Sequence, residues 1–226
     1  DPATGHLWLG GPALYWDEHS LLLLAAELGR GEVEAGGEAA PRPDEPIQYI
    51  DYAQWHCDLL ADGAAPGRAE GVAFWRDARL DQIPAPAFAR GADGEGDAAA
   101  ADHGRVIERA QLGRQVLALA EALRVAPGAV LAAAWGIVLA RLYGDAELQL
   151  GYRFAGRRLS ELEGCIGPLD CWLPLRLLPD PARSFEDEVR AAGDIIARAT
   201  RALDWAWGAD DAPALRPPAG ISCVII

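Results

Sequence analysis

The segment 127–143 constrains the fold most, because its residues are apolar on nearly every face. Pro127 suits the first turn of a helix, where its missing N–H costs nothing, and Gly144 suits the position just after the last turn. A helix that is apolar all round is expected to lie at the centre of a protein. Two apolar strands and an amphipathic helix follow it, at 147–152, 171–178 and 184–202. This alternation predicts an α/β core.

Weaker patterns place further elements along the chain. Helical spacing of apolar residues predicts helices at 21–30, 47–62, 68–80 and 113–125. Short apolar runs predict strands at 5–10, 105–112 and 221–226. Segments rich in Gly, Pro and Ala predict loops or linkers at 31–46, 82–103 and 208–220. Trp55 and Trp75 lie near the centres of two predicted helices, which is typical of aromatic core anchors, and Ser184 is placed to cap its helix.

The charge of the chain argues against several partners and locations. Its formal net charge is -14 and all 20 basic residues are Arg, so it repels nucleic acid and anionic membranes. No run of about 18 apolar residues lacks a charge, Gly or Pro, so no membrane span is predicted and the expected location is cytoplasmic. The chain opens at Asp1 without Met, and we expect it to be a processed piece of a longer protein.

The four cysteines show no metal-ligand spacing. We therefore expect reduced, mostly buried thiols and no bound metal. They are Cys57, Cys165, Cys171 and Cys223.

A loop at 12–20 brings acidic and basic side chains together just before a helix. Asp17, Glu18 and His19 are adjacent there, so a proton donor and a proton acceptor are both available. The same pattern is typical of a helix start, in which Asp17 or Ser20 caps the first turn and the acids suit the helix dipole. No Ser has the glycine flanks of a nucleophile elbow, and no glycine-rich phosphate loop has the required spacing.

Several segments agree in order and spacing with one known pattern. QYIDYAQW at 48–55 matches QYxDYAxWQ, and Phe74-Trp75 followed by Leu80 matches FWxxxL. AVLAAAW at 129–135 and LARLYG at 139–144 match the two halves of the helix VLLAAWALVLARLTG. Further matches are Gly151, Gly156-Arg157, Gly167-Pro168, Leu173-Pro174-Leu175-Arg176 and Ser184-Phe185. Across most of its length the chain resembles the condensation domains of nonribosomal peptide synthetases.

This resemblance implies a chloramphenicol-acetyltransferase-like α/β fold, in which two lobes enclose a tunnel. It implies peptidyl or acyl carrier proteins as partners and their phosphopantetheine arm as the substrate carrier, with no tightly bound cofactor. Domains of the family are longer than this chain, so both lobes are expected to be incomplete. The expected division is a partial N-terminal lobe at 1–81, an interlobe linker at 82–103 and a truncated C-terminal lobe at 104–226. A second chain that completes the fold is the alternative to a fragment.

The signature loop of the family, HHxxxDG, falls on the sequence PALYWDE, where three of the four fixed positions differ. Pro12 and Ala13 replace the two histidines, and Glu18 replaces the glycine. Ala13 stands where the family has its catalytic His, and it has no nitrogen to accept the proton of an acceptor amine. The retained Asp17 is structural in the family and pairs with the Arg of the later GR motif. The resemblance therefore implies a buried ion pair between Asp17 and Arg157.

Three functions are compatible with this altered loop. The expected one is a condensation-like domain of nonribosomal peptide or hybrid polyketide biosynthesis that binds carrier proteins or recruits a tailoring enzyme, such as an oxygenase. The second is an acyltransferase that uses Glu18 or His19 as its base, and the third is a structural spacer. Arg153, Arg157 and Arg158 could hold a phosphopantetheine or an acidic carrier face, although surface ion pairs are the commoner use of such arginines.

Overall fold

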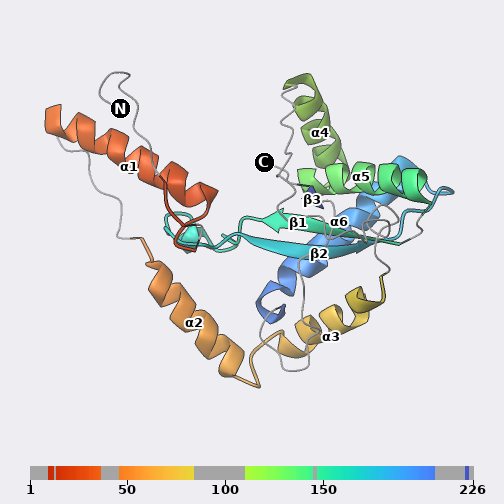
Figure 1. Ribbon diagram of the computed structural model, residues 1–226, viewed down its shortest axis with the longest axis horizontal. Coiled ribbons are helices and arrows are strands. Elements are labelled where there is room, and N and C mark those ends of the chain that lie inside the picture. The colour runs from red at the N-terminus through yellow and green to blue at the C-terminus, as the bar shows by residue number, and fades with distance from the viewer. Residues whose placement is uncertain are drawn as a thin grey trace, which may run out of the picture. The chain divides into compact units, whose positions relative to one another are not determined.

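The computed structural model in Figure 1 describes residues 10–12, 14–36, 46–83, 110–144, 147–206 and 222–223. The chain forms two compact units. Unit 1 consists of Asp1–Asp62 and Phe154–Cys171, and unit 2 of Gly63–Arg153 and Trp172–Ile226. These units have other boundaries than the lobes expected from the sequence, whose division stays a prediction.

A three-stranded sheet forms the base of unit 2 and has the strand order β2-β1-β3. Its strands are β1 (Leu148–Phe154), β2 (Cys171–Leu177) and β3 (Ser222–Cys223). β3 runs parallel to β1, with Ser222 opposite Gly151. The apolar strands predicted near 147–152 and 171–178 are confirmed, and the short β3 lies inside the strand predicted at 221–226.

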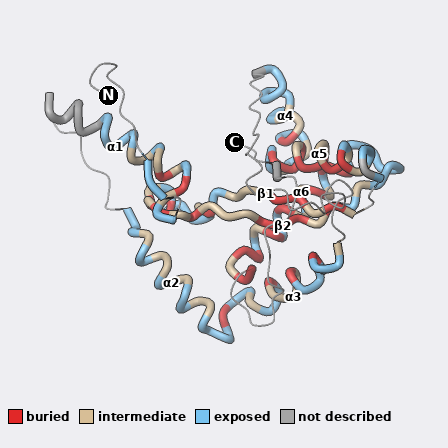
Figure 2. Tube along the Cα trace, in the orientation of Figure 1, coloured by how far each residue is buried: buried red, intermediate tan, exposed pale blue. Residues whose placement is uncertain are grey.

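Helices α4 (Ala110–Leu123), α5 (Pro127–Tyr143) and α6 (Phe185–Arg201) belong to the same unit. α5 packs against both of the others. α5 also lies over β2, since a Cβ added at Gly136 would lie 3.1 Å from Leu177 Cδ1. Figure 2 shows the buried residues concentrated in α5, α6, β1 and β2. We refer to α5, α6, β1 and β2 together as the α5–α6 layer.

The ends of α5 and the start of α6 follow the sequence prediction. Pro127 occupies the first turn of α5, and Gly144 ends it in the left-handed conformation with φ 70°. Ser184 Oγ accepts a hydrogen bond from Asp187 N at 3.2 Å and so caps α6. α5 is buried along one side only, because Val138 and Leu142 are exposed. Within the described residues, the central position expected for this helix therefore holds for one of its sides only.

Two tryptophans fix helix α3 (Arg68–Ala78) to the end of α6. Trp75 is buried and its Nε1–H donates to Ala202 O at 2.7 Å. Trp205, in the 3-10 helix η3 (Leu203–Trp205), lies so close to Gly71 that a Cβ there would overlap its indole ring. The 3-10 helix η1 (Leu80–Gln82) follows α3. Trp75 is a core anchor, as predicted.

Unit 1 contains α1 (Glu18–Gly36), α2 (Tyr49–Ala61) and the 3-10 helix η2 (Ser160–Leu162). Its apolar cluster is small and consists of Leu162, Cys165 and Leu169, with Tyr49 and Tyr52 packed against them. No residue of α2 is fully buried. Unit 1 therefore has much less apolar core than unit 2 within the described residues.

Four sequence predictions are corrected by the structure. The linker predicted from residue 31 begins later, because α1 continues to Gly36; Gly29 and Gly31 cost a helix about 1 kcal/mol each without forbidding it. The strand predicted at 105–112 is wrong at 110–112, which start α4, since Ala and Gln favour helices over strands. Trp55 is 44% exposed rather than a core anchor. Cys57 is exposed, whereas Cys165 is buried and Cys171 is half-buried.

Several predicted segments lie outside the described residues, namely the strand at 5–9, the linker from 84 onward and the loop at 208–220. Among the described helices, none is by itself long and apolar enough to cross a membrane. The helices at Gln111–Leu123 and Pro127–Leu142 reach that composition only as a pair bent by 106°.

Candidate functional site

Asp17 is the buried centre of the loop that precedes α1. It is 6% exposed and stands immediately before the first residue of the helix. Its Oδ1 accepts hydrogen bonds from Ser20 N at 2.8 Å and from Ser20 Oγ at 2.7 Å. A side-chain acceptor that binds the third N–H of a helix is the usual N-cap geometry. Asp17 is therefore the cap of α1, as the sequence pattern had suggested.

Arg157 reaches the same carboxylate from the segment that follows β1. Its Nη1 donates to Asp17 Oδ2 at 2.6 Å and its Nη2 donates to Asp17 Oδ1 at 3.0 Å. The side chains of Arg157 and Asp17 are 5% and 1% exposed. A bidentate pair of this kind is among the strongest side-chain interactions. The ion pair implied by the resemblance is thus present, and its contribution to stability stays a prediction.

The segment 164–170 is bound to this pair through its main chain. Leu169 N and Asp170 N donate to Asp17 Oδ2 at 3.2 and 3.1 Å, and Cys165 O accepts from Arg157 Nη2 at 2.9 Å. Ser20 Oγ also accepts from Gly167 N at 3.0 Å. We call Asp17, Ser20 and Arg157 the Asp17 cluster. This cluster joins the start of α1 to two segments that lie about 140 to 150 residues later in the chain.

One glycine is needed for Arg157 to reach the cluster. Gly156 has φ 72°, in the region that favours glycine, and a Cβ there would overlap the carbonyl of Leu169. The Gly-Arg pair of the sequence motif is therefore explained locally: the glycine allows the close approach, and the arginine makes the ion pair.

The environment of Asp17 favours its charged form. Burial alone would raise the pKa of this carboxyl, but the hydrogen bonds from Arg157 and Ser20, with the guanidinium charge, outweigh burial. Together they lower the pKa from its ordinary 3.8 to about 2. Asp17 is ionised at any physiological pH and accepts hydrogen bonds from five donor groups. These properties suit a structural anchor and not a proton shuttle.

Pro12, Ala13 and Glu18, which the resemblance assigns to the signature loop, and His19 were the other candidate residues. Pro12 is exposed, and its carbonyl accepts from Tyr15 N at 3.1 Å, which closes a turn. Ala13 lies outside the described residues. Glu18 is exposed in the first turn of α1. His19 is half-buried, and its Nε2 lies 3.1 Å from Glu163 O.

One feature of the cluster was missed by sequence reasoning. The sequence pattern indicates Ser20 only as a helix cap, yet its hydroxyl also binds the segment around Gly167. Nothing in the local pattern around Ser20 pointed to a contact 147 residues away. Arg153 and Arg158 do not belong to the cluster. Among the described residues, no three or more His, Cys, Asp or Glu side chains group in a way that could hold a metal ion.

Comparison with known proteins decides the family. The profile of the Condensation domain family matches residues 29–206. The chain belongs to this family. Bacitracin synthase 1 of Bacillus licheniformis is 27% identical over 192 residues, which are 78% of this chain and 3% of that protein. The isonitrile lipopeptide synthase of Mycobacterium tuberculosis is 28% identical over 178 residues, which are 74% of this chain and 7% of that protein.

Solved structures confirm the condensation-domain, chloramphenicol-acetyltransferase-like fold. SgcC5 of Streptomyces globisporus has a TM-score of 0.67 at 20% identity, covering 89% of this chain and 46% of its own. A condensation domain of chain release from the enacyloxin polyketide synthase has a TM-score of 0.61 at 24% identity, covering 85% and 36%. The X-domain of teicoplanin biosynthesis, solved in complex with OxyB, has a TM-score of 0.58 at 20% identity, covering 85% and 43%. The chain thus spans less than half the length of each of these structures.

Proposed function

We propose that this condensation-like domain binds carrier proteins and recruits a tailoring enzyme to them, and does not form peptide bonds by the His mechanism. The observation that carries the proposal is Ala13, which stands at the position of the catalytic His in the signature loop. Loss of a positioned general base typically costs on the order of 100- to 10,000-fold in rate. A methyl side chain supplies neither the base nor a hydrogen bond that would orient an acceptor amine.

The Asp17 cluster supports a binding function for the same loop. Arg157 and Ser20 hold the carboxylate of Asp17 in one geometry, and the main chain of 164–170 is fixed with it. A loop that has lost its base but keeps its anchor retains a defined surface. Recognition needs such a surface, because a pre-ordered segment loses less conformational entropy when a partner binds.

The class of partner is suggested by one structural relative. The X-domain of teicoplanin biosynthesis was solved in complex with OxyB, so a member of this fold can hold a second protein. We carry this over as part of the proposal: the recruited partner is an oxygenase that acts on a peptide attached to the phosphopantetheine arm of a carrier protein.

Acyl transfer through another base is less well supported. Glu163 O is a carbonyl and can only accept, so His19 Nε2 carries the hydrogen, and the ring is held by the main chain of the neighbouring segment. Glu18 is an exposed acid in the first turn of α1, where it suits the helix dipole. Both residues have a local structural use, which favours the binding function.

The test is an intact-mass assay in which the full chain is mixed with loaded donor and acceptor carrier proteins. We expect saturable binding of a loaded carrier, measured in parallel by calorimetry, and no acyl transfer above the rate without the chain. Unloaded carrier protein is the control for recognition of the arm. Acyl transfer that disappears in Glu18→Gln or His19→Ala would instead assign the acyltransferase function. Absence of both carrier binding and acyl transfer would contradict the proposal and would favour the third function, a structural spacer.

A further inference from the structure

A cavity of about 650 Å³ lies within unit 2, and none of its lining residues belongs to the Asp17 cluster. It is bounded by the second half of α5 and by residues 179–188, which connect β2 to α6 and include the first turn of α6. Sites for small organic ligands typically have volumes of roughly 300–1,000 Å³. The cavity is therefore large enough for a short peptide or for another small organic ligand of similar size.

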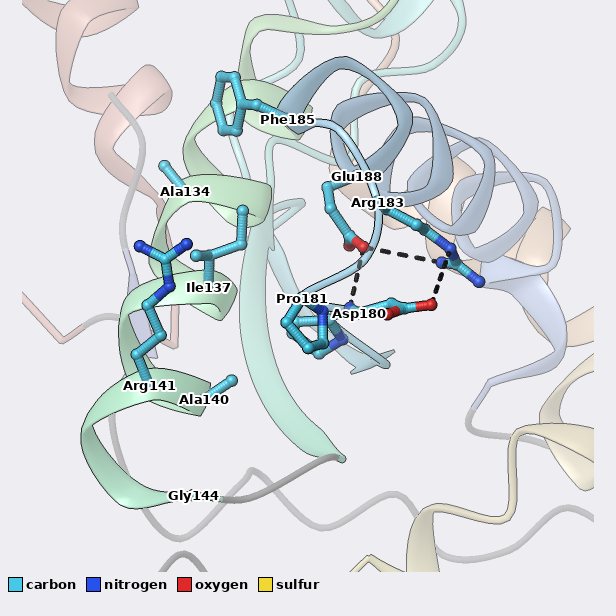
Figure 3. A pocket seen from close by; sticks show the side chains of 11 residues that line it. Ala134, Ile137, Ala140, Arg141, Gly144, Asp180, Pro181, Arg183, Phe185 and Glu188 are labelled. Carbon is cyan, nitrogen blue, oxygen red and sulfur yellow. Dashed lines mark hydrogen bonds and ion pairs between the residues drawn. The ribbon is translucent and has the colours of Figure 1, made fainter.

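The middle of the cavity is apolar. Ile137 and Ala140 on α5 are directed toward Pro181 on the opposite wall, as Figure 3 shows. Phe185 lines the same space and is 43% exposed. These side chains offer apolar surface and no hydrogen-bonding groups, so a ligand held between them gains most from apolar groups of its own.

One wall carries an excess of negative charge. Glu188 has a side chain that is 9% exposed, and its Oε1 accepts from Asp180 N at 2.9 Å. A single guanidinium, that of Arg183, lies 3.8 Å from both the Glu188 and the Asp180 carboxylates. Two carboxylates that share one cation leave a net charge of about -1 at this wall. Among the described residues, Glu188 Oε2 receives no hydrogen bond.

The facing wall carries a positive charge. Arg141 lines the cavity from α5, and Figure 3 shows it on the opposite side from Asp180, Arg183 and Glu188. Within the described part of the chain it makes no ion pair and no hydrogen bond. A guanidinium presents a planar set of donors that matches a carboxylate. The cavity thus has an acidic wall, an apolar middle and a basic wall.

We propose that this cavity binds a short apolar peptide with free termini, its ammonium group at Glu188 and its carboxylate at Arg141. A sphere of this volume is about 11 Å across, which three extended residues of roughly 3.3–3.6 Å each can span. In a single amino acid the two charged groups are only two covalent bonds apart, which is much less than this width. The proposal is independent of the function proposed for the signature loop, because no residue is shared between the two sites.

The first experiment is isothermal titration calorimetry of the full chain with the tripeptide Leu-Leu-Leu. We expect saturable binding at one site. N-acetylation and C-terminal amidation of the tripeptide each remove one charge, and each is expected to weaken binding at least about tenfold. Binding of free leucine as tight as that of the tripeptide, equal binding of the blocked peptides, or no saturable binding at millimolar peptide would each overturn the proposal.

The second experiment uses variants with matched controls. Glu188→Gln keeps the acceptor for Asp180 N, and Arg141→Gln changes an exposed side chain, so both are expected to fold. Each variant should bind the tripeptide at least about tenfold more weakly than the wild type. In Arg141→Gln, C-terminal amidation of the peptide should no longer reduce its affinity. Glu186→Gln and Arg190→Gln change an exposed pair on α6 outside the cavity and should bind normally. Equal weakening by these controls would overturn the assignment.

Discussion

The Asp17 cluster and the α5–α6 layer are held together by different forces. In the cluster, one carboxylate accepts from two side chains and three main-chain N–H groups, and the surrounding apolar core is small. In the layer, Leu173, Val189 and Ala129 are completely buried among other apolar side chains. Directional bonds to a buried charge are few and individually strong, whereas dispersion contacts are many and individually weak. A single substitution can therefore remove several hydrogen bonds of the cluster at once, whereas a substitution in the layer removes some of many weak apolar contacts.

The same contrast bears on function. The layer supplies the fold that the chain shares with condensation domains in general. The cluster fixes the segment just before α1, and it holds Asp17 in its charged form. The proposed replacement of the catalytic His by Ala13 is compatible with an ordered loop, since the anchor consists of Asp17, Ser20 and Arg157.

The largest expected effect is that of Arg157→Ala. Removal of one partner from a buried ion pair leaves an uncompensated charge, and we expect a loss of about 3–5 kcal/mol in the free energy of unfolding. Urea denaturation gives the magnitude, and hydrogen exchange at the amides of Gly167, Leu169 and Asp170 locates it.

Leu173→Ala in the layer is the comparison, with an expected cost of about 2–5 kcal/mol from lost burial and a residual cavity. In this variant, hydrogen exchange at the amides of residues 167–170 should increase only as much as the loss in global stability requires. If Arg157→Ala cost less than about 1 kcal/mol, or left those amides protected, the cluster would not be the anchor of the loop.

An intermediate effect is expected from pH. The pKa of Asp17 is lowered from 3.8 to about 2 in the folded chain, so the unfolded chain binds more protons between these values. Stability from this group is therefore fully present above about pH 4 and is lost as the pH falls toward 2, by about 2 kcal/mol in total.

The measurement is the free energy of unfolding of wild type and of Asp17→Asn between pH 2 and 6. The difference in the free energy of unfolding between wild type and Asp17→Asn should become smaller as the pH falls through this range. Asp51→Asn, which removes an exposed carboxylate of α2 outside the cluster, is the control substitution measured over the same pH range. A gap independent of pH would contradict the lowered pKa of Asp17.

The smallest expected effect is that of Ser184→Ala in the layer. Its hydroxyl accepts from Asp187 N and caps α6, and loss of such a cap costs about 1 kcal/mol. Ser160→Ala is the matched control, because within the described ranges that hydroxyl donates to the neighbouring Glu161 side chain and caps no α-helix. Thermal denaturation of both variants decides the matter; equal melting temperatures would show that the α6 cap adds nothing to the stability of the layer.

Sequence patterns predicted the layer more completely than unit 1. The helix predicted at 127–143 was found with those bounds, since proline, an apolar run and glycine are local signals. Trp55 and Trp75 gave the same local signal, yet only Trp75 is buried. Burial depends on what lies opposite a helix face, and in α3 that is the end of α6, which brings Ala202 and Trp205 to it.

Local sequence patterns predicted α5, α6 and Asp17 as a helix cap, and the series of motifs identified the family. The replacement of the signature histidines by Pro12 and Ala13 stays a prediction from that resemblance. The partnership of Asp17 with Arg157 followed from the family resemblance. The folded structure was needed to show that Ser20 joins them and that the acidic and basic walls line one cavity. Caps and turns arise from neighbours a few residues apart, whereas Ser20 and Gly167 are 147 positions apart, and Arg141 is 39 to 47 positions from the residues of the acidic wall.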